Sequence, residues 1–220
     1  MNNALTIFFV FLVSAGLTWY LSNPASRLSV LDEPNERSLH KVPVPRSGGL
    51  AILLGVLFGS FPLVIQAEAV PGLGAVMVGA TLIAIVSFMD DLSGVSPKFR
   101  LLVHSVAAVL VLAGGLIPDR FQLPGYQWLW PSSASLIFTA LFLVWMTNLY
   151  NFMDGMDGFA GGMTVFGFGA YALLGWQAGE PLFTTASLIV AASAMGFLLF
   201  NFPPARIFMG DVGSSALGFL

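Results

Sequence analysis

The stretch NLYNFMDGMDGFAGG, from Asn148 to Gly162, contains two aspartates, two asparagines and four glycines, and it lies at the end of a segment without any charged residue, Phe121 to Met153. That uncharged segment is longer than the roughly 20 residues with which a helix crosses the hydrocarbon layer. Ionisable side chains at a membrane edge cost free energy, and they commonly mark functional sites. The stretch therefore predicts a membrane helix that ends in a functional site.

The composition of the whole chain is typical of a membrane protein. Hydrophobic residues make up 57% of the sequence and charged residues 9%, whereas about a quarter of the residues of a soluble domain are charged. Backbone groups find no partners in lipid, and the long apolar runs lack the alternation of barrel strands, so helices are the expected spanning elements. The chain has no cysteine, which excludes disulfides and thiolate metal sites. We expect an all-α, polytopic integral membrane protein.

The apolar gaps between clusters of charge predict about seven complete transmembrane helices and the start of an eighth. The predicted helices cover residues 4–22, 48–66, 70–89, 98–117, 134–152, 160–178 and 182–200, and the eighth begins near Ser215. We interpret residues 1–220 as a single membrane-embedded domain. We expect this domain to be truncated at its C-terminus, because the last apolar segment is too short to span a bilayer.

The basic residues predict the orientation, because short cytoplasmic loops are enriched in lysine and arginine. Under this helix assignment, seven of the eight lie on one side and Arg120 on the other; the seven are Arg27, Arg37, Lys41, Arg46, Lys98, Arg100 and Arg206. The N-terminus is therefore expected outside. Five aspartates fall at the cytoplasmic ends of helices: Asp90, Asp91, Asp154, Asp157 and Asp211. The active site is predicted on the cytoplasmic face.

Three motifs, each joining two helices, carry these aspartates: FMDDLSGVSPKFRLLVH (Phe88–His104), NLYNFMDGMDG (Asn148–Gly158) and PARIFMGDVGSSALGF (Pro204–Phe219). Ser96 and Pro97 form a favourable helix start, a capping hydroxyl followed by proline in the first turn. Neighbouring helical residues diverge by about 100°, so Asp90 and Asp91 are expected to have separate roles. Residues three apart stay close on a helix, which applies to Asp154 and Asp157.

Converging carboxylates need a cation nearby. Two carboxylates 4 Å apart repel each other by about 4 kcal/mol at an effective dielectric constant of 20. Oxygen ligands that leave room for water and phosphate suit Mg²⁺, with Mn²⁺ as an alternative. The first loop contributes positive groups that suit phosphate oxygens, namely Arg37, His40, Lys41 and Arg46. A diphosphate held by magnesium is therefore the expected occupant.

Other interpretations of these residues stay open. His104 is expected to be a packed or hydrogen-bonded core histidine rather than a ligand. A cation-coupled transporter is the alternative function, in which the same acids would bind the coupling ion. Transport sites are expected near the bilayer midplane, often within repeated halves. The acids here are predicted at helix ends, and the sequence shows no obvious repeat.

Four motifs resemble those of the polyprenyl-phosphate N-acetylhexosamine-1-phosphate transferases in their order and in their placement on one face. They are HKVPVPRSGGLA, DDLSGVSPKFRLLVH, NLYNFMDGMDGFAGG and FMGDVGSSALGF. This group, glycosyltransferase family 4, includes the phospho-N-acetylmuramoyl-pentapeptide transferase of peptidoglycan synthesis and enzymes that initiate O-antigen, capsule and teichoic acid synthesis. The resemblance implies Mg²⁺-dependent transfer of a sugar-1-phosphate from a UDP-N-acetylhexosamine to polyprenyl phosphate, usually undecaprenyl phosphate, with release of UMP. It also implies the bacterial cytoplasmic (inner) membrane as location, with no nucleic acid partner; a homodimer stays open.

The resemblance assigns roles to residues of this chain. Asp90 would deprotonate or orient the lipid phosphate, Asp211 would bind the metal, and Asp91 would stand beside it. Asp90, Asp91 and Asp211 are thus the candidate catalytic residues, and the candidate metal ligands are Asp211, Asp154 and Asp91. Candidate substrate-binding residues are Asn148, Asn151, Asp154, Asp157, Arg37, His40, Lys41, Arg46 and Lys98. The choice between direct attack and a covalent aspartyl-phosphate stays open.

Overall fold

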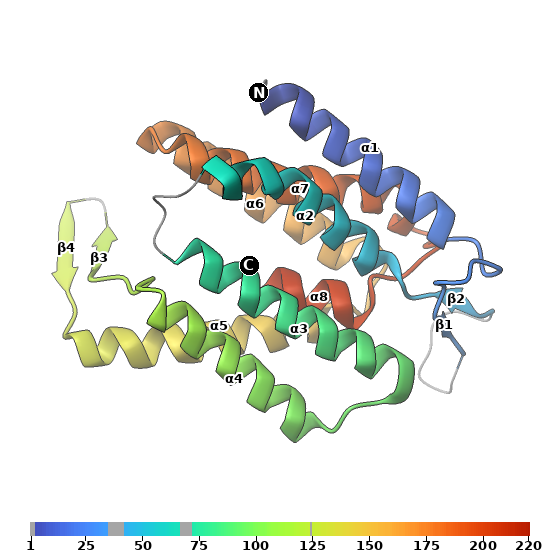
Figure 1. Ribbon diagram of the computed structural model, residues 1–220, viewed down its shortest axis with the longest axis horizontal. Coiled ribbons are helices and arrows are strands. Elements are labelled where there is room, and N and C mark those ends of the chain that lie inside the picture. Colours follow the sequence, from blue (N-terminus) through green and yellow to red (C-terminus); the bar gives the residue numbers. More distant parts are fainter. Residues whose placement is uncertain (1–2, 35–41, 67–71, 124) are drawn as a thin grey trace.

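The computed structural model describes residues 3–34, 42–66, 72–123 and 125–220. Within these ranges the chain forms eight helices and two short antiparallel ladders (Figure 1). The helices are α1 (Asn3–Leu21), α2 (Gly48–Gln66), α3 (Leu73–Ser93), α4 (Pro97–Ala113), α5 (Ser132–Met153), α6 (Phe159–Ala178), α7 (Pro181–Asn201) and α8 (Gly210–Phe219). Each predicted helix is thus present, and the largest differences are at its ends.

Five helices in the described part of the chain are long and apolar enough to cross a membrane: α1, α3, α5, α6 and α7. This finding confirms a mostly helical, multi-pass architecture. The helices α2 and α4, which the sequence also predicts as spans, have 19 and 17 residues. Seven complete spans and an outward N-terminus stay predictions.

Two helix ends differ from the prediction because of glycine. The third helix continues past residue 89 to Ser93, so Asp90 and Asp91 are helical, and it ends where Gly94 takes a φ of 70°. The fourth helix ends at Ala113 rather than near residue 117, because Gly114 and Gly115 follow and Gly115 has a φ of 84°. Glycine adopts such positive φ values without the steric cost that other residues meet. The predicted start of α4 is confirmed, since the Phe99 amide donates to the Ser96 hydroxyl at 3.3 Å and Pro97 occupies the first turn.

The two ladders were not predicted. One pairs β1 (Leu31–Asp32) with β2 (Val44–Pro45), and the other pairs β3 (Arg120–Leu123) with β4 (Tyr126–Leu129). They lie at opposite ends of the molecule in Figure 1. The β1–β2 ladder leads directly into α2, so it fixes the chain just before the first glycines of that helix.

The helices pack around two central elements. Helix α7 contacts α1, α2 and α6, while the short helix α8 contacts α2, α3 and α5. All residues of α8 from Val212 to Phe219 are buried, including the hydroxyl-bearing Ser214 and Ser215. Small side chains permit this close packing: a Cβ on Gly49 of α2 would overlap the backbone of Gly213.

The start of α8 is held by backbone hydrogen bonds to the start of α2. The Phe208 amide donates to the Pro45 carbonyl at 2.7 Å, and the amides of Gly48 and Gly49 donate to the carbonyls of Phe208 and Met209. These bonds place the GDVGSS segment beside β2 and Arg46. The third motif therefore lies where the first loop joins α2.

Candidate active site

Asp90 and Asp91, at the end of α3, face different partners. Asp90 accepts a hydrogen bond from the Val95 amide through one carboxylate oxygen and pairs with Arg100 through the other. Asp91 is 5% exposed, and its carboxylate lies 3.6 Å from Nε of Arg46. The divergence expected for adjacent helical residues is thus confirmed.

Asp91 also accepts hydrogen bonds from the first amides of α8. The Asp211 amide lies 3.4 Å from one of its carboxylate oxygens, and the Val212 amide lies 3.3 Å from the other. Those amides have no partner within their own helix, and a negative charge beside a helix N-terminus is stabilising. Asp91 therefore caps a helix that begins 119 residues further along the chain.

Arg100 joins the first and third motifs. Its Nη1 pairs with Asp90 and donates to a carboxylate oxygen of Asp211 at 2.9 Å. Arg100 is not among the residues predicted for the site, where the sequence indicates it only as a topology signal. A second signal was present in the sequence: Arg100 lies in the first turn of the helix that Ser96 and Pro97 start, next to the aspartate pair.

Asp154 follows the last residue of α5 and approaches the start of α8. Burial raises the pKa of its carboxyl group well above the usual value, and the nearby Asp211 carboxylate raises that pKa further, while the Gly210 amide opposes the shift. Asn151, on the last turn of α5, donates to the hydroxyl of Ser214 at 3.1 Å. The second motif thus meets the third through Asn151 and Asp154.

Gly210 allows this approach of three segments. It has a φ of 74°, and a Cβ at this position would overlap the carbonyl of Arg46 and lie 3.1 Å from Asp91 Oδ2. A larger residue would separate the first loop from α8. The MGDVG sequence therefore needs glycine at its second position for steric reasons.

The structure brings some predicted site residues together and places others apart. Asp157 is exposed and accepts from the Ala205 amide at 2.9 Å, so it binds the segment before α8, whereas Asp154 faces the start of that helix. Their three-residue spacing does not give them a shared partner, because α5 ends between Asn151 and the turn that carries both aspartates.

Asn148 contacts α4 instead of the carboxylates. Its amide nitrogen donates to the Val144 carbonyl at 2.7 Å and lies 3.2 Å from Nδ1 of His104. His104 is 5% exposed, which confirms the prediction of a buried, hydrogen-bonded histidine.

The predicted basic residues also separate. Arg46 lies within the cluster: its guanidinium group donates to the Asp91 carbonyl and is 3.9 Å from Asp32. Lys98 is exposed on the first turn of α4. Arg37, His40 and Lys41 lie outside the described residues.

We call the group formed by Asp90, Asp91, Asp154, Asp211, Arg46 and Arg100 the acidic cluster. When all of its groups are ionised, the four carboxylates and two guanidinium groups carry a net formal charge of −2. Across the described ranges, no three acidic or histidine side chains already stand in an arrangement that would hold a metal ion. The predicted ligands Asp211, Asp154 and Asp91 nevertheless belong to one cluster, at the start of α8.

Comparison with known proteins agrees with the motifs. The model of the family described as "Glycosyl transferase family 4" matches residues 73–220. A relative from Bacillus subtilis, named "Probable undecaprenyl-phosphate N-acetylglucosaminyl 1-phosphate transferase", is 36% identical over 199 residues, which cover 89% of this chain and 54% of the relative. A "Decaprenyl-phosphate N-acetylglucosaminephosphotransferase" of Mycobacterium tuberculosis is 32% identical over 95% of this chain and 57% of its own length.

A third relative is a "Phospho-N-acetylmuramoyl-pentapeptide-transferase" of Shouchella clausii, 34% identical over 86% of this chain and 62% of its own length. The chain thus spans a little more than half the length of the curated relatives it matches. The matched region contains α3 to α8 and all three aspartate motifs. On this evidence of sequence and motif, the chain belongs to glycosyl transferase family 4.

Proposed function

We propose that this protein transfers an N-acetylhexosamine-1-phosphate from a UDP-sugar to a polyprenyl phosphate, such as undecaprenyl phosphate, and releases UMP. An oxygen of the lipid phosphate forms a bond to the β-phosphorus of the UDP-sugar, and the bond from that phosphorus to the bridging oxygen breaks. The product is a lipid-linked sugar of the kind that starts a cell-envelope polysaccharide. The names of the relatives support this reaction class.

The observation that carries the proposal is the contact of Arg100 with both Asp90 and Asp211. Phosphoryl transfer depends on charge neutralisation and alignment more than on a special nucleophile. Because the arginine lies between two carboxylates from separate motifs, a cation that can bind phosphate stands next to a carboxylate that can act as a base. In this arrangement Asp90 would accept a proton from the lipid phosphate or orient it, and Arg100 would bind phosphate oxygens.

The acidic cluster fits a divalent cation. The raised pKa of the Asp154 carboxyl group reflects a partly buried carboxylate beside another negative charge, an arrangement that a cation would stabilise. We propose Asp154 and Asp211 as ligands of Mg²⁺, with Mn²⁺ as an alternative. Asp91 would stand beside the ion, because both of its oxygens already accept backbone hydrogen bonds. When bound, the ion would neutralise diphosphate charge.

We further propose the bacterial cytoplasmic membrane as the location, with the acidic cluster on the cytoplasmic side and the N-terminus outside. The distribution of the basic residues supports this orientation. A site at the membrane edge lets a water-soluble nucleotide sugar reach a lipid phosphate without either substrate leaving its own phase.

The test uses membranes that contain the natural full-length protein, undecaprenyl phosphate and UDP-sugars labelled in the sugar. Label should pass into a butanol-extractable lipid with stoichiometric release of UMP, and a panel of UDP-sugars would identify the donor. EDTA should abolish the transfer and Mg²⁺ should restore it. No lipid-linked label with any donor would refute the function, while transfer that survives EDTA would refute the metal proposal alone.

A further inference from the structure

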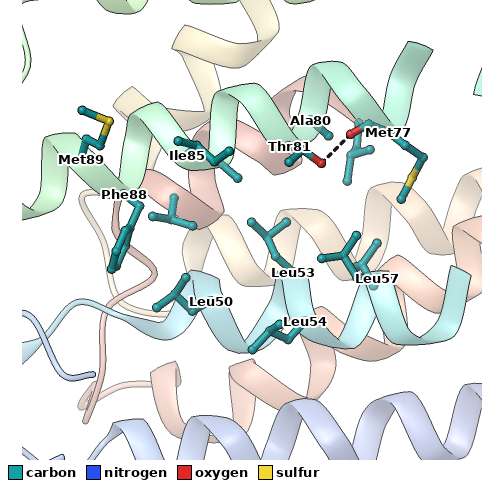
Figure 2. Close-up of a pocket in the computed structure, with 14 residues that line it drawn as sticks. Leu50, Leu53, Leu54, Leu57, Met77, Ala80, Thr81, Ile85, Phe88 and Met89 are labelled. Carbon is teal, nitrogen blue, oxygen red and sulfur yellow. Dashed lines mark hydrogen bonds between the residues drawn. The ribbon is translucent and has the colours of Figure 1, made fainter. Parts of the chain in front are cut away.

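The β3–β4 ladder carries exposed aromatic side chains outside the helices. Tyr126 is 62% exposed and Trp128 is 59% exposed. The apolar cleft between α2 and α3 has a different composition, because its described lining residues are mainly aliphatic and include neither tryptophan nor tyrosine (Figure 2). Tryptophan and tyrosine are enriched where a membrane meets water, since each joins an apolar ring to a polar N–H or O–H group. The ladder therefore has the composition of a membrane interface.

The two faces of the ladder differ in chemistry. Successive residues of a strand point to opposite sides, so Tyr126 and Trp128 lie on one face. Gln127 and Leu129 lie on the other face. Arg120 is directly opposite Leu129 in the register and therefore shares this second face, where its guanidinium group forms an exposed ion pair. One face is thus aromatic, and the other carries an amide and a charge.

A continuous row of rings joins the aromatic face to α5. The ring centroids of Trp128 and Trp130 are 6.1 Å apart, and those of Trp130 and Phe138 are 4.9 Å apart. Phe138 in turn stacks on Phe142 at 5.9 Å. Phe138, Phe142 and Trp145 follow one another at intervals of four and three residues, so they lie along one face of α5, and each is at least 46% exposed. Because α5 is long and apolar enough to cross a membrane, the aromatic face of the ladder continues a surface that meets lipid.

Two hydrogen bonds hold the base of the ladder against the start of α5. The Trp130 amide donates to the Asp119 carbonyl at 3.2 Å, and the Ser135 hydroxyl, in the first turn of α5, donates to the Pro118 carbonyl. In Figure 1 the ladder lies beyond the start of α5 and runs across the direction of that helix. This placement suits a segment that lies in the plane of the membrane interface.

Helix α5 extends from the ladder to the acidic cluster. Its 22 residues rise about 33 Å, which is close to the ~30 Å thickness of the hydrocarbon layer. The ladder precedes its first residue, and Asp154 follows its last residue. If the aromatic face lies at one interface of the membrane, the acidic cluster is therefore placed at the other.

We propose that Tyr126, Trp128 and Trp130 form a docking surface for the lipid interface on the membrane side opposite the acidic cluster. The three rings contact the ends of the acyl chains, while Gln127 and Arg120 face water. This contact fixes the depth of α5 in the membrane, and hence the depth of the second motif at its other end. The inference goes beyond the proposed function and does not depend on it.

The first test compares two neighbouring residues on opposite faces of the ladder. Residues 1–220 contain no cysteine, so Tyr126→Cys and Gln127→Cys each give one labelling site in the full-length protein, once any cysteine outside this range is replaced by serine. Each variant is labelled with an environment-sensitive fluorophore and placed in lipid nanodiscs. Two quenchers are compared, a phosphatidylcholine with a nitroxide near its headgroup, and iodide in the water.

The nitroxide lipid should quench the label at residue 126 at least about threefold more than the label at residue 127, and iodide should show the reverse preference. Equal quenching at both residues would overturn the inference. A label at residue 126 that is protected from both quenchers would show that protein, such as a second copy of the chain, covers the aromatic face. That result would also overturn the inference.

The second test removes the ring that joins the ladder to α5. In the protein labelled at residue 126, Trp130→Ser breaks the row of rings between Trp128 and Phe138, and quenching by the nitroxide lipid should fall at least about twofold. Leu129→Ser is the matched control, because Leu129 is 68% exposed and lies on the other face, and it should leave the quenching unchanged. Equal quenching in the two variants would exclude Trp130 from the docking surface. Melting temperatures identify any variant that fails to fold, and the first test, at two exposed residues, stands without this pair.

Discussion

Arg100 and Asp211 are 111 residues apart in the sequence, and the arginine donates to the aspartate carboxylate at 2.9 Å. The bond connects the first turn of α4 with the first turn of α8, and the same guanidinium nitrogen pairs with Asp90. Removing one charge of this partly buried group leaves the opposite charge uncompensated. The loss of stability is then larger than on removing an exposed ion pair.

Replacing either aspartate of this contact should remove activity. Asp90→Asn and Asp211→Asn keep the shape of the side chain and remove its charge, and each should lower turnover at least about 100-fold, as expected for a general base or a metal ligand. The control is Asp119→Asn, because Asp119 is exposed in the segment just before β3 and pairs with its neighbour Arg120. Initial rates of lipid-linked sugar formation provide the measurement; near-normal rates in the first two variants would refute their assigned roles.

Arg100→Met should lower turnover by roughly 10- to 100-fold, since it removes a positive group from the place where phosphate charge must be stabilised. Arg100→Lys should recover part of that loss, because an ammonium group keeps the charge without the planar fork of donors. Arg120→Met removes an arginine whose ion pair is exposed, and it should have little effect. Equal turnover in Arg100→Met and Arg120→Met would contradict the importance of the contact between α4 and α8.

Asp154→Asn should stabilise the metal-free protein at neutral pH. Burial and the Asp211 carboxylate raise the pKa of Asp154 above its usual value of 3.8, so ionisation of this group is harder in the folded than in the unfolded protein. Stability is therefore lost as the pH rises from about 3.8 through the raised pKa, and the variant avoids this loss. Its advantage in Tm should disappear below about pH 4.

Magnesium should reverse this order. The ion should raise the Tm of the wild type, because binding to the folded state alone stabilises it, and raise that of Asp154→Asn much less. Asp157→Asn serves as the control, since Asp157 is exposed and binds the Ala205 amide. A magnesium shift in Tm that is identical in the wild type and Asp154→Asn would exclude Asp154 as a ligand.

The orientation can be measured directly because the chain has no native cysteine. A cysteine in place of Ser93, in the last turn of α3 beside the acidic cluster, should be protected from a membrane-impermeant maleimide in intact cells. A cysteine in place of the exposed Gln127, in β4 at the other end of the molecule, should react. Both should react after the cells are made permeable. The reverse pattern in intact cells would place the cluster outside.

The sequence alone determined the helices and the chemistry available at their ends. Hydrophobic runs of membrane length predicted seven of the helices, because an apolar helix is the favoured structure for such a run in lipid, and a shorter apolar segment predicted the start of the eighth. Ser96 with Pro97, and the aspartates among glycines, predicted where the chain turns and where its charges gather. Those signals are local, so they can be read from consecutive residues.

Tertiary structure decided which partner each charged side chain meets. Asp91 caps α8, Arg100 joins Asp90 to Asp211, and Asp157 turns away to Ala205. The contacts of Asp91 and Arg100 with the start of α8 do not follow from spacing along the chain, because they depend on how the small residues of α8 let it pack among α2, α3 and α5. Local sequence thus sets where charges can appear, and the packing of distant helices sets which of them are close enough to act together.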